Sequence, residues 1–261
     1  FPYTTLFRSP ATKVMEDDKS VQYSSGALTA KLSKGESFNL EFLAGEKVIT
    51  HQRAKGISIF NDGESHYLSA QINLGVGELV YGLGERFTAF AKNGQSVDIW
   101  NADGGTSSEQ AYKNIPFYLT NRGYGVFVNN TGKVSFEVAS EVVEKVQFSA
   151  KTQDLQYFVI YGPTPAEILE KYTSLTGRAP QLPEWSFGLW LSTSFVTDYD
   201  EKRVTAFIDE MEQREIPLDV FHFDCFWIIR LFPDGRVGIA NDPIDAYCTD
   251  CGAASDHHLH V

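Results

Sequence analysis

Apolar and polar residues alternate along most of the first 160 residues, and this period of two predicts β-strands with one buried face. Two such runs, residues 117–120 and 124–128, flank an Asn-Arg-Gly turn and predict a β-hairpin. Many short strands separated by Gly and Asn turns are typical of an antiparallel β-sandwich. The other alternating runs lie at residues 28–32, 38–42, 68–74, 134–138, 146–148 and 155–161.

The pattern changes after residue 162. Thr164 and Glu167 have the spacing of a helix capping box, with Pro165 at the first helical position. Gly177 is placed to end this helix. The Pro-rich residues 179–183 then form a stiff, extended connector, because each proline removes a backbone donor and disfavours helix before it. We therefore expect a domain boundary at this connector.

A different architecture is predicted beyond the connector. The apolar run 187–191 and residues 220–223 are candidate buried strands, and Asp200 can cap a helix between them. Ile216 and Pro217 are placed to stop that helix. A strand, a helix and a strand within about 40 residues form a βαβ unit, whose strands should be parallel. The apolar face of this helix contains Val204, Phe207, Ile208 and Met211.

Composition and charge narrow the function classes. The chain has 261 residues, of which 43% are hydrophobic and 21% charged, as in ordinary globular proteins. Its formal net charge of −12 repels phosphate backbones and anionic lipid, so we expect neither nucleic acid nor membrane as a partner. The aromatic share of 13% suits a large β core or a sugar-binding surface.

Cysteine usage indicates the compartment. The three cysteines are too few and too clustered for a disulfide framework, so we expect a reducing, cytoplasmic location. Cys248 and Cys251, followed by three histidines, could instead form a zinc site, but their spacing fits no common zinc finger. We expect no metal and no cofactor. The residues concerned are Cys225, Cys248, Cys251, His257, His258 and His260.

Candidate substrate-binding residues lie where the two predicted parallel strands end. Functional groups of parallel α/β folds gather at the carboxyl ends of strands, so Asp224 and Phe195 should line the same rim. A carboxylate accepts hydrogen bonds from sugar hydroxyls, and an aromatic face packs against the C–H face of a pyranose. The structural alternative is that Phe226 and Trp227 belong to a core and that Asp224 caps a following element.

Other segments carry weaker signals. Residues 100–106 combine Trp, Asn and Asp with two glycines and form either a polar surface loop or a plain Asx turn. Residues 82–87 lack the third glycine and the following helix that a dinucleotide site requires. His222, between two phenylalanines, is expected to be a core histidine. The sequon at residues 129–131 is expected to be a chance match.

Several motifs in a consistent order resemble glycoside hydrolase family 31. The segment Phe223-Asp224-Cys225-Phe226-Trp227 is more similar to the bacterial α-xylosidase branch than to the α-glucosidases. The resemblance covers roughly residues 20 to 227 and is far more specific than one short match. Its motifs are residues 82–87, 100–106, 109–118, 185–195 and 222–227.

The resemblance implies a retaining α-glycosidase built from an N-terminal antiparallel β-sandwich and a (β/α)8 barrel, of which this chain would hold the first βαβ unit. The substrate would be an oligosaccharide. The oligomeric state is left open, with a homo-oligomer of the full-length enzyme as one alternative. The implied divisions are a foreign start at 1–9, a galactose-mutarotase-like sandwich at 10–162, a helix and linker at 163–183, the start of the barrel at 184–227 and an unmatched tail at 228–261.

The resemblance also implies roles for five residues. Asp224 resembles the aspartate that binds hydroxyls of the non-reducing-end sugar. Phe195, Cys225 and Phe226 resemble residues that wall the same subsite, and in the xylosidases that wall leaves little room for a hydroxymethyl group. Asp103 resembles a loop residue that reaches from the sandwich toward the sugar. All five are substrate-binding candidates.

No catalytic residue is assigned. Retaining hydrolysis needs a nucleophile and an acid/base whose carboxyl groups lie about 5–5.5 Å apart. In this family both come from later barrel strands, and the match ends after Trp227. We therefore expect an incomplete chain that is inactive alone, with a loosely held βαβ unit, because two strands cannot close a barrel. The alternatives are an α-glucosidase of the same family and a non-catalytic carbohydrate-binding β-sandwich module.

Overall fold

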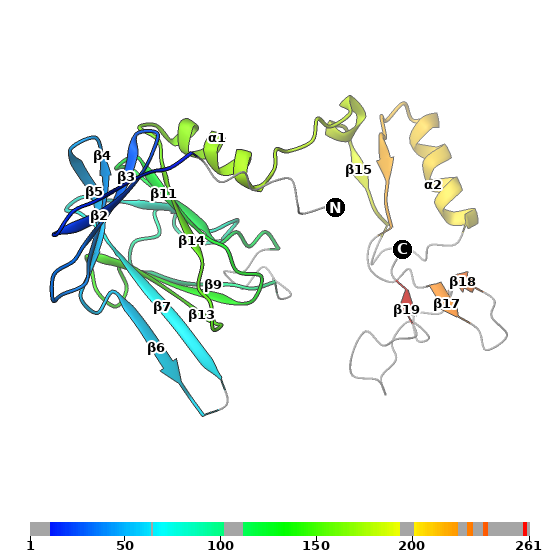
Figure 1. Ribbon diagram of the computed structural model, residues 1–261. Coiled ribbons are helices and arrows are strands. Elements are labelled where there is room, and N and C mark those ends of the chain that lie inside the picture. The colour runs from blue at the N-terminus through cyan, green and yellow to red at the C-terminus, as the bar shows by residue number, and fades with distance from the viewer. Residues whose placement is uncertain are drawn as a thin grey trace. The chain divides into compact units, whose positions relative to one another are not determined.

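The computed structural model describes residues 11–63, 65–101, 112–193 and 201–223 with their side chains, together with the backbone of three short later strands. The chain divides into two compact units, Phe1–Arg178 and Ala179–Val261. Each unit is described here by itself (Figure 1). The three later strands are β17 (Ile229–Leu231), β18 (Val237–Ile239) and β19 (His258–Leu259), which pair antiparallel in the order β18-β17-β19.

The first unit begins with an antiparallel meander in which every strand pairs with its neighbour in sequence. Gly26 and Gly45 occupy turns between these strands with φ of 58° and 60°, a region that glycine enters without steric cost. The strands are β1 (Lys13–Glu16), β2 (Ser20–Ser25), β3 (Leu28–Ser33), β4 (Asn39–Ala44) and β5 (Lys47–Arg53).

Two further antiparallel sheets form the sandwich. One has the order β6-β7-β13-β12-β9 and the other the order β14-β11-β10-β8. The predicted antiparallel sandwich is therefore confirmed, and the hairpin occupies the predicted residues. The strands are β6 (Ile57–Asn61), β7 (His66–Asn73), β8 (Val80–Gly82), β9 (Gln95–Ile99), β10 (Phe117–Thr120), β11 (Tyr124–Val128), β12 (Val134–Val138), β13 (Lys145–Lys151) and β14 (Tyr157–Tyr161).

The core lies between these two sheets and follows the sequence alternation. In β12 every second residue is buried, and β13 repeats this pattern beside it. Phe136 and Phe148 pair directly across the two strands, and both are fully buried. Burying one such side chain contributes roughly 1.5–3 kcal/mol, so this cluster is the main source of stability in the unit. Its other fully buried members include Ile72, Val80, Leu83, Tyr118, Tyr124, Val126, Val128, Val134, Val138 and Val146.

The meander is attached to the sandwich through polar contacts between β5 and β7. Thr50 Oγ1 donates to the Asn73 carbonyl at 2.7 Å, and Gln52 Nε2 donates to the Gln71 carbonyl at 3.0 Å. Gln52 is fully buried, and its Oε1 accepts a hydrogen bond from the Tyr157 hydroxyl at 2.6 Å. Buried polar groups are tolerated when they are paired in this way.

Helix α1 (Pro165–Thr176) covers the outer face of the second sheet (Figure 1). The predicted capping box is confirmed, because Thr164 and Glu167 bond to each other's backbone N–H groups. Gly177 ends the helix, as expected. The helix buries Ile168 completely and stacks Tyr172 on Phe117 with ring centroids 4.0 Å apart, so it forms a third layer.

The second unit contains the predicted βαβ pattern. Strand β15 (Trp190–Leu191) pairs in parallel with β16 (Val220–Phe221), and α2 (Glu201–Gln213) lies between them in sequence. Both strands are shorter than expected; residues 184–187, where the first was expected to begin, form a 3-10 turn before β15. Asp219 fixes the start of the pair, since its Oδ2 accepts the Leu189 N–H at 2.9 Å. No residue of α2 is buried.

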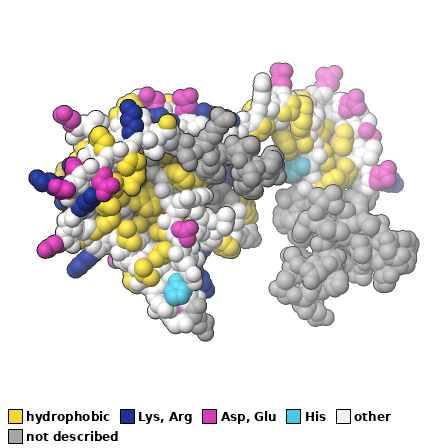
Figure 2. All heavy atoms as spheres, in the orientation of Figure 1, with side chains coloured by type: hydrophobic (Ala, Val, Ile, Leu, Met, Phe, Trp, Pro, Cys, Tyr) yellow, Lys and Arg dark blue, Asp and Glu magenta, His cyan; other side chains and the backbone are white. Residues whose placement is uncertain are grey.

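Apolar side chains reach the surface of the second unit, where Figure 2 shows them in yellow. Phe187 is 76% exposed, and Trp190 and Phe223 are about half exposed. His222 is half-buried beside the Trp190 ring, so it lies just beyond β16 rather than in a core. Within the described ranges, no helix is long and apolar enough to cross a membrane.

Candidate functional site

The five predicted substrate-binding residues lie outside the described residues. They are Asp103, Phe195, Asp224, Cys225 and Phe226. The structure describes the segments that lead into them, and these segments come from both units. Their roles stay predictions, and the geometry below concerns the framework that supports them.

In the second unit, the two strands end at the same edge. The last paired residues are Leu191 and Phe221, and the His222 N–H continues the ladder by donating to the Leu191 carbonyl at 2.9 Å. Phe195 follows its strand by four positions and Asp224 follows its strand by three. Because the strands are parallel, both segments leave from the carboxyl edge, where functional groups of α/β folds gather.

In the first unit, Arg86 joins three segments of the motif region. Its Nη2 donates to the Asp98 carbonyl at 2.7 Å and also to Asn114 Oδ1. Asn114 Nδ2 in turn donates to Asn101 Oδ1 at 2.6 Å. The guanidinium therefore fixes the last described residues before the segment that carries Asp103. This role of Arg86 could not be predicted from the sequence, because the partners that it joins lie 12 and 28 residues away.

Gly84 explains why this motif region needs glycine. Its φ is +83°, and a Cβ at this position would lie 1.9 Å from the Lys113 carbonyl oxygen. The Glu85 N–H donates to that same carbonyl at 2.9 Å. The close approach of the two backbones thus brings residues 82–87 against residues 113–118, two motifs that the sequence separates.

Two ionisable groups support the loop and the strand beside this framework. The Lys92 ammonium is buried and donates to the Ala89 carbonyl at 2.8 Å; burial and then the charge of Arg86 lower its pKa. Burial raises the pKa of Asp98, but hydrogen bonds from Lys133 and Ser135 outweigh it and leave the pKa below its ordinary value. Asp98 therefore stays charged at neutral pH and holds β9 to β12.

A groove of about 270 Å³ opens beside this framework, and we call it the Trp100 groove. Trp100 is 53% exposed, whereas the neighbouring Ile99 is buried. The place of Asn130 and Thr131 in the lining of this groove could not be predicted, because these residues stood out in the sequence only as part of a glycosylation sequon. The lining residues are Ile99, Trp100, Asn101, Asn114, Pro116, Asn130, Thr131 and Gly132.

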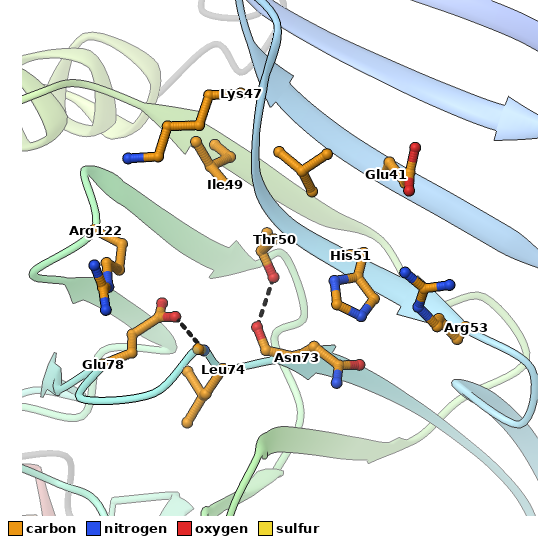
Figure 3. A pocket seen from close by; sticks show the side chains of 12 residues that line it. Glu41, Lys47, Ile49, Thr50, His51, Arg53, Asn73, Leu74, Glu78 and Arg122 are labelled. Carbon is orange, nitrogen blue, oxygen red and sulfur yellow. Dashed lines mark hydrogen bonds between the residues drawn. The ribbon is translucent and has the colours of Figure 1, made fainter.

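A second pocket, of about 390 Å³, lies between β5 and the loop that joins β7 to β8 (Figure 3). Glu78 is only 5% exposed, and its Oε2 accepts the Gly75 N–H at 2.6 Å, which closes that loop. Five of the twelve described lining residues are charged, and none is a Phe, Tyr or Trp. The lining includes Glu41, Lys47, His51, Arg53, Glu78 and Arg122.

The described residues contain no cluster of three or more His, Cys, Asp or Glu side chains that could hold a metal ion. The Cys248–His260 segment, considered above for zinc, contributes no described side chains. The expectation of no metal and no cofactor therefore stays a prediction.

Two family models match the chain. Residues 7–137 match the glycosyl hydrolase 31 N-terminal galactose mutarotase-like domain, and residues 179–236 match the glycosyl hydrolases family 31 TIM-barrel domain. The first match covers the meander and most of the sandwich. The second covers the βαβ unit.

Relatives in the same family are similar over much of the chain. The α-xylosidase XylQ of Lactiplantibacillus pentosus is 53% identical over 84% of this chain, and an α-xylosidase of Emericella nidulans is 59% identical over 62% of it. A solved structure of a mutant GH31 dextranase from Flavobacterium johnsoniae, in complex with isomaltotriose, matches 84% of this chain with a TM-score of 0.72 and 26% identity.

These alignments cover only part of each relative: 29% and 21% of the two α-xylosidases and 27% of the dextranase chain. The chain therefore spans about a quarter of the length of the proteins it matches. The two family matches agree with the sandwich and the parallel βαβ unit that the structure shows. The protein therefore belongs to glycoside hydrolase family 31, in the α-xylosidase branch.

Proposed function

We propose that the whole protein is a retaining α-xylosidase that releases α-xylose from the non-reducing ends of oligosaccharides. The observation that carries this proposal is the identity of 53% and 59% to two proteins named α-xylosidase. The match of residues 179–236 to the catalytic barrel favours an enzyme over a carbohydrate-binding module, which would not need a βαβ unit. We also propose a cytoplasmic location, on the basis of cysteine usage.

This chain would supply part of the sugar pocket. Asp224 and Asp103 would accept hydrogen bonds from hydroxyls of the terminal sugar. Phe195, Cys225 and Phe226 would wall that subsite and exclude a hydroxymethyl group, so that xylose is preferred to glucose. The parallel register supports this arrangement, because it sends the segments of Phe195 and Asp224 from one edge of the pair.

The bond-breaking groups would come from other parts of the longer protein. A retaining enzyme uses one carboxylate as nucleophile and a second carboxyl group as acid and then base, about 5–5.5 Å apart. The first forms a covalent glycosyl-enzyme, and water then releases the sugar with retention of configuration. Residues 11–223 would contribute binding and orientation only, so the 261-residue chain should not turn over substrate.

The experiment compares this chain with a longer chain that completes the barrel, using an aryl α-xyloside. The longer chain should hydrolyse it, and the 261-residue chain should not. In the longer chain, Asp224→Asn should lower kcat/KM by about 100-fold, since a hydrogen bond to a charged group contributes about 1.5–3 kcal/mol. Turnover by the 261 residues alone, or an aryl α-glucoside preferred by the longer chain, would contradict the proposal.

A further inference from the structure

Strand β6 forms one edge of the five-stranded sheet of the sandwich, and among the described strands it pairs only with β7. Its large apolar side chains lie at the surface, since Ile57, Ile59 and Phe60 are 51%, 72% and 56% exposed. Residues 56–61 include no charged residue and no proline, which are the usual devices that stop an edge from pairing. This edge is therefore open to a further strand.

The hydrogen bonds to β7 show which backbone groups of β6 point outward. The Gln71 N–H donates to the Gly56 carbonyl at 2.8 Å, and the Asp62 N–H donates to the Ser65 carbonyl at 3.2 Å. Alternate residues of an antiparallel strand bond to the same neighbour, so the even-numbered residues of β6 bond to β7. The N–H and C=O groups of the odd-numbered residues therefore point away from β7, where an added strand can pair with them. These residues are Ile57, Ile59 and Asn61.

The apolar side of β6 continues the core side of its sheet. Ile57 lies opposite Ala70 and Ile59 lies opposite Leu68, so both isoleucines are on the side that the core occupies. Ala70 is 1% exposed whereas Ile59 is 72% exposed, so the layer that covers Ala70 does not extend to β6. Figure 1 shows the β6–β7 hairpin reaching past the rest of the first unit. A strand added to β6 would place its own side chains beside these isoleucines.

Other sheet edges of the first unit carry the protection that β6 lacks. Strand β9, at the opposite edge of the same sheet, contains Asp98, whose carboxylate pairs with the Lys133 ammonium at 2.6 Å. Strand β1, at the edge of the meander, begins with Lys13 and ends with Glu16. Charged side chains resist an approaching strand, because pairing would remove them from water. The uncharged edge at β6 differs from both and is suited to pairing.

A second copy of β6 complements this edge. Two neighbouring strands related by a two-fold axis run antiparallel, and the same face of the sheet continues from one copy to the other. With the axis at Ser58, Ile57 of each copy lies opposite Ile59 of the other, which gives two pairs of β-branched side chains on the core side. At the two ends of the contact, Lys55 of one copy comes within one position of Asp62 of the other, so opposite charges meet there.

We infer that β6 is the contact strand of a two-fold homodimer, in which the two five-stranded sheets join into one continuous sheet. The outward backbone groups, the isoleucines and the charges at the strand ends each find a partner in the second copy, whereas an unrelated strand would have to match all three. The inference goes beyond the proposed function and does not depend on it, since it concerns a surface of the sandwich and involves no sugar-binding residue.

Sedimentation velocity of the longer chain tests the dimer. Wild type should be a dimer, or a larger assembly of dimers, at micromolar concentration. Ile59→Lys places a charge in the contact and should raise the dissociation constant of the dimer by about 30-fold or more. Val143→Lys is the matched control, since Val143 is 82% exposed in the loop between β12 and β13, and it should leave the assembly unchanged. Circular dichroism should be the same for all three proteins, because both substituted side chains are exposed.

Cysteine cross-linking of the longer chain tests the register. On the two-fold axis, Ser58 of the two copies forms a non-hydrogen-bonded pair, whose Cα atoms are about 4.5 Å apart and within reach of a disulfide. Ser58→Cys should therefore give a disulfide-linked dimer on mild oxidation, whereas Ser96→Cys, on the opposite edge strand β9, should not.

The inference is overturned by a monomeric wild type, by an assembly that Ile59→Lys leaves unchanged, or by cross-linking that does not distinguish the two cysteines. In a monomer, slow hydrogen exchange at the Ile57 and Ile59 amides would show that a strand of the same longer chain covers this edge instead.

Discussion

The sandwich and the βαβ unit carry similar apolar patterns but bury them to very different degrees. In the sandwich, Phe136 and Phe148 are fully buried between two sheets. In the βαβ unit, Phe187 and Trp190 are 76% and 48% exposed, and α2 buries no residue. An apolar pattern therefore specifies which face of an element can be buried, whereas burial itself requires a second layer, and only the sandwich has one among the described residues.

The largest expected difference concerns the two phenylalanines that represent these regions. Phe148→Ala should lower the free energy of unfolding of the first unit by about 3–5 kcal/mol, because it leaves a cavity in a closed core. Phe187→Ala should change stability by no more than about 0.5 kcal/mol, since little area is lost. Urea unfolding followed by circular dichroism measures both. Equal effects would show that the second unit has a core of its own.

Two glycines sharpen the comparison, because each would place a Cβ 1.9 Å from another atom. At Gly84 that atom is a backbone carbonyl in the sandwich, and φ is +83°, so Gly84→Ala should cost roughly 3 kcal/mol. At Gly188 it is the Asp219 carboxylate, a side chain that can rotate away, so Gly188→Ala should cost about 1 kcal/mol.

Gly94→Ala is the control for backbone strain alone. Its φ is +86°, and no atom lies within 4 Å of the added Cβ. Thermal unfolding should rank the three substitutions with Gly84 far ahead. A Gly84→Ala protein as stable as Gly94→Ala would mean that the approach of residues 82–87 to residues 113–118 is looser than described.

The sequence predicted the sandwich well for a physical reason. Alternation in strands such as β12 and β13 is a local signal, and the burial of their even positions follows it residue by residue. The capping box of α1 is equally local, because Thr164 and Glu167 are three residues apart. Such features depend on neighbours in sequence and can be seen without coordinates.

The framework of the candidate site could not be predicted in the same way. Arg86 acts on Asp98 and Asn114 from different segments, and Asn130 meets Trp100 across 30 residues of chain. No periodicity marks such contacts. The family resemblance suggested Asp103 and Asp224 through motifs, but it carried no information on the lining of the Trp100 groove.

Buried tyrosines provide a pH test that applies to the sandwich alone. Burial raises the pKa of Tyr157 to about 12, and burial followed by nearby negative charge raises the pKa of Tyr118 and Tyr124 well above the ordinary value. Between about pH 10 and 12 the unfolded chain loses these protons while the folded chain keeps them. The contribution of these three tyrosines to the free energy of unfolding should therefore be constant below pH 10 and fall as the pH rises above it.

Tyr157 accounts for roughly 2–3 kcal/mol of this fall, since each pKa unit corresponds to about 1.4 kcal/mol. Tyr157→Phe should reduce the fall by that amount, at the cost of the hydrogen bond to Gln52 at all pH values. Tyr23→Phe, at a half-exposed site, should leave the pH profile unchanged. An unchanged profile in Tyr157→Phe would refute the assignment of the alkaline loss to this buried ring.

The smallest effect concerns α1, the last element before the connector between the two units. Thr164→Ala removes the hydroxyl that accepts the Glu167 N–H and should destabilise the first unit by about 1 kcal/mol. Ser174→Ala is the control, because its hydroxyl bonds only to the Lys171 carbonyl of the same helix and is exposed. Since α1 buries Ile168 against the second sheet, the loss should appear as faster amide exchange in α1, β11 and β14 and not in β15 or β16. Faster exchange in β15 or β16 would instead mean that the stability of the βαβ unit depends on the helix, and the contrast between the two regions would then be one of degree.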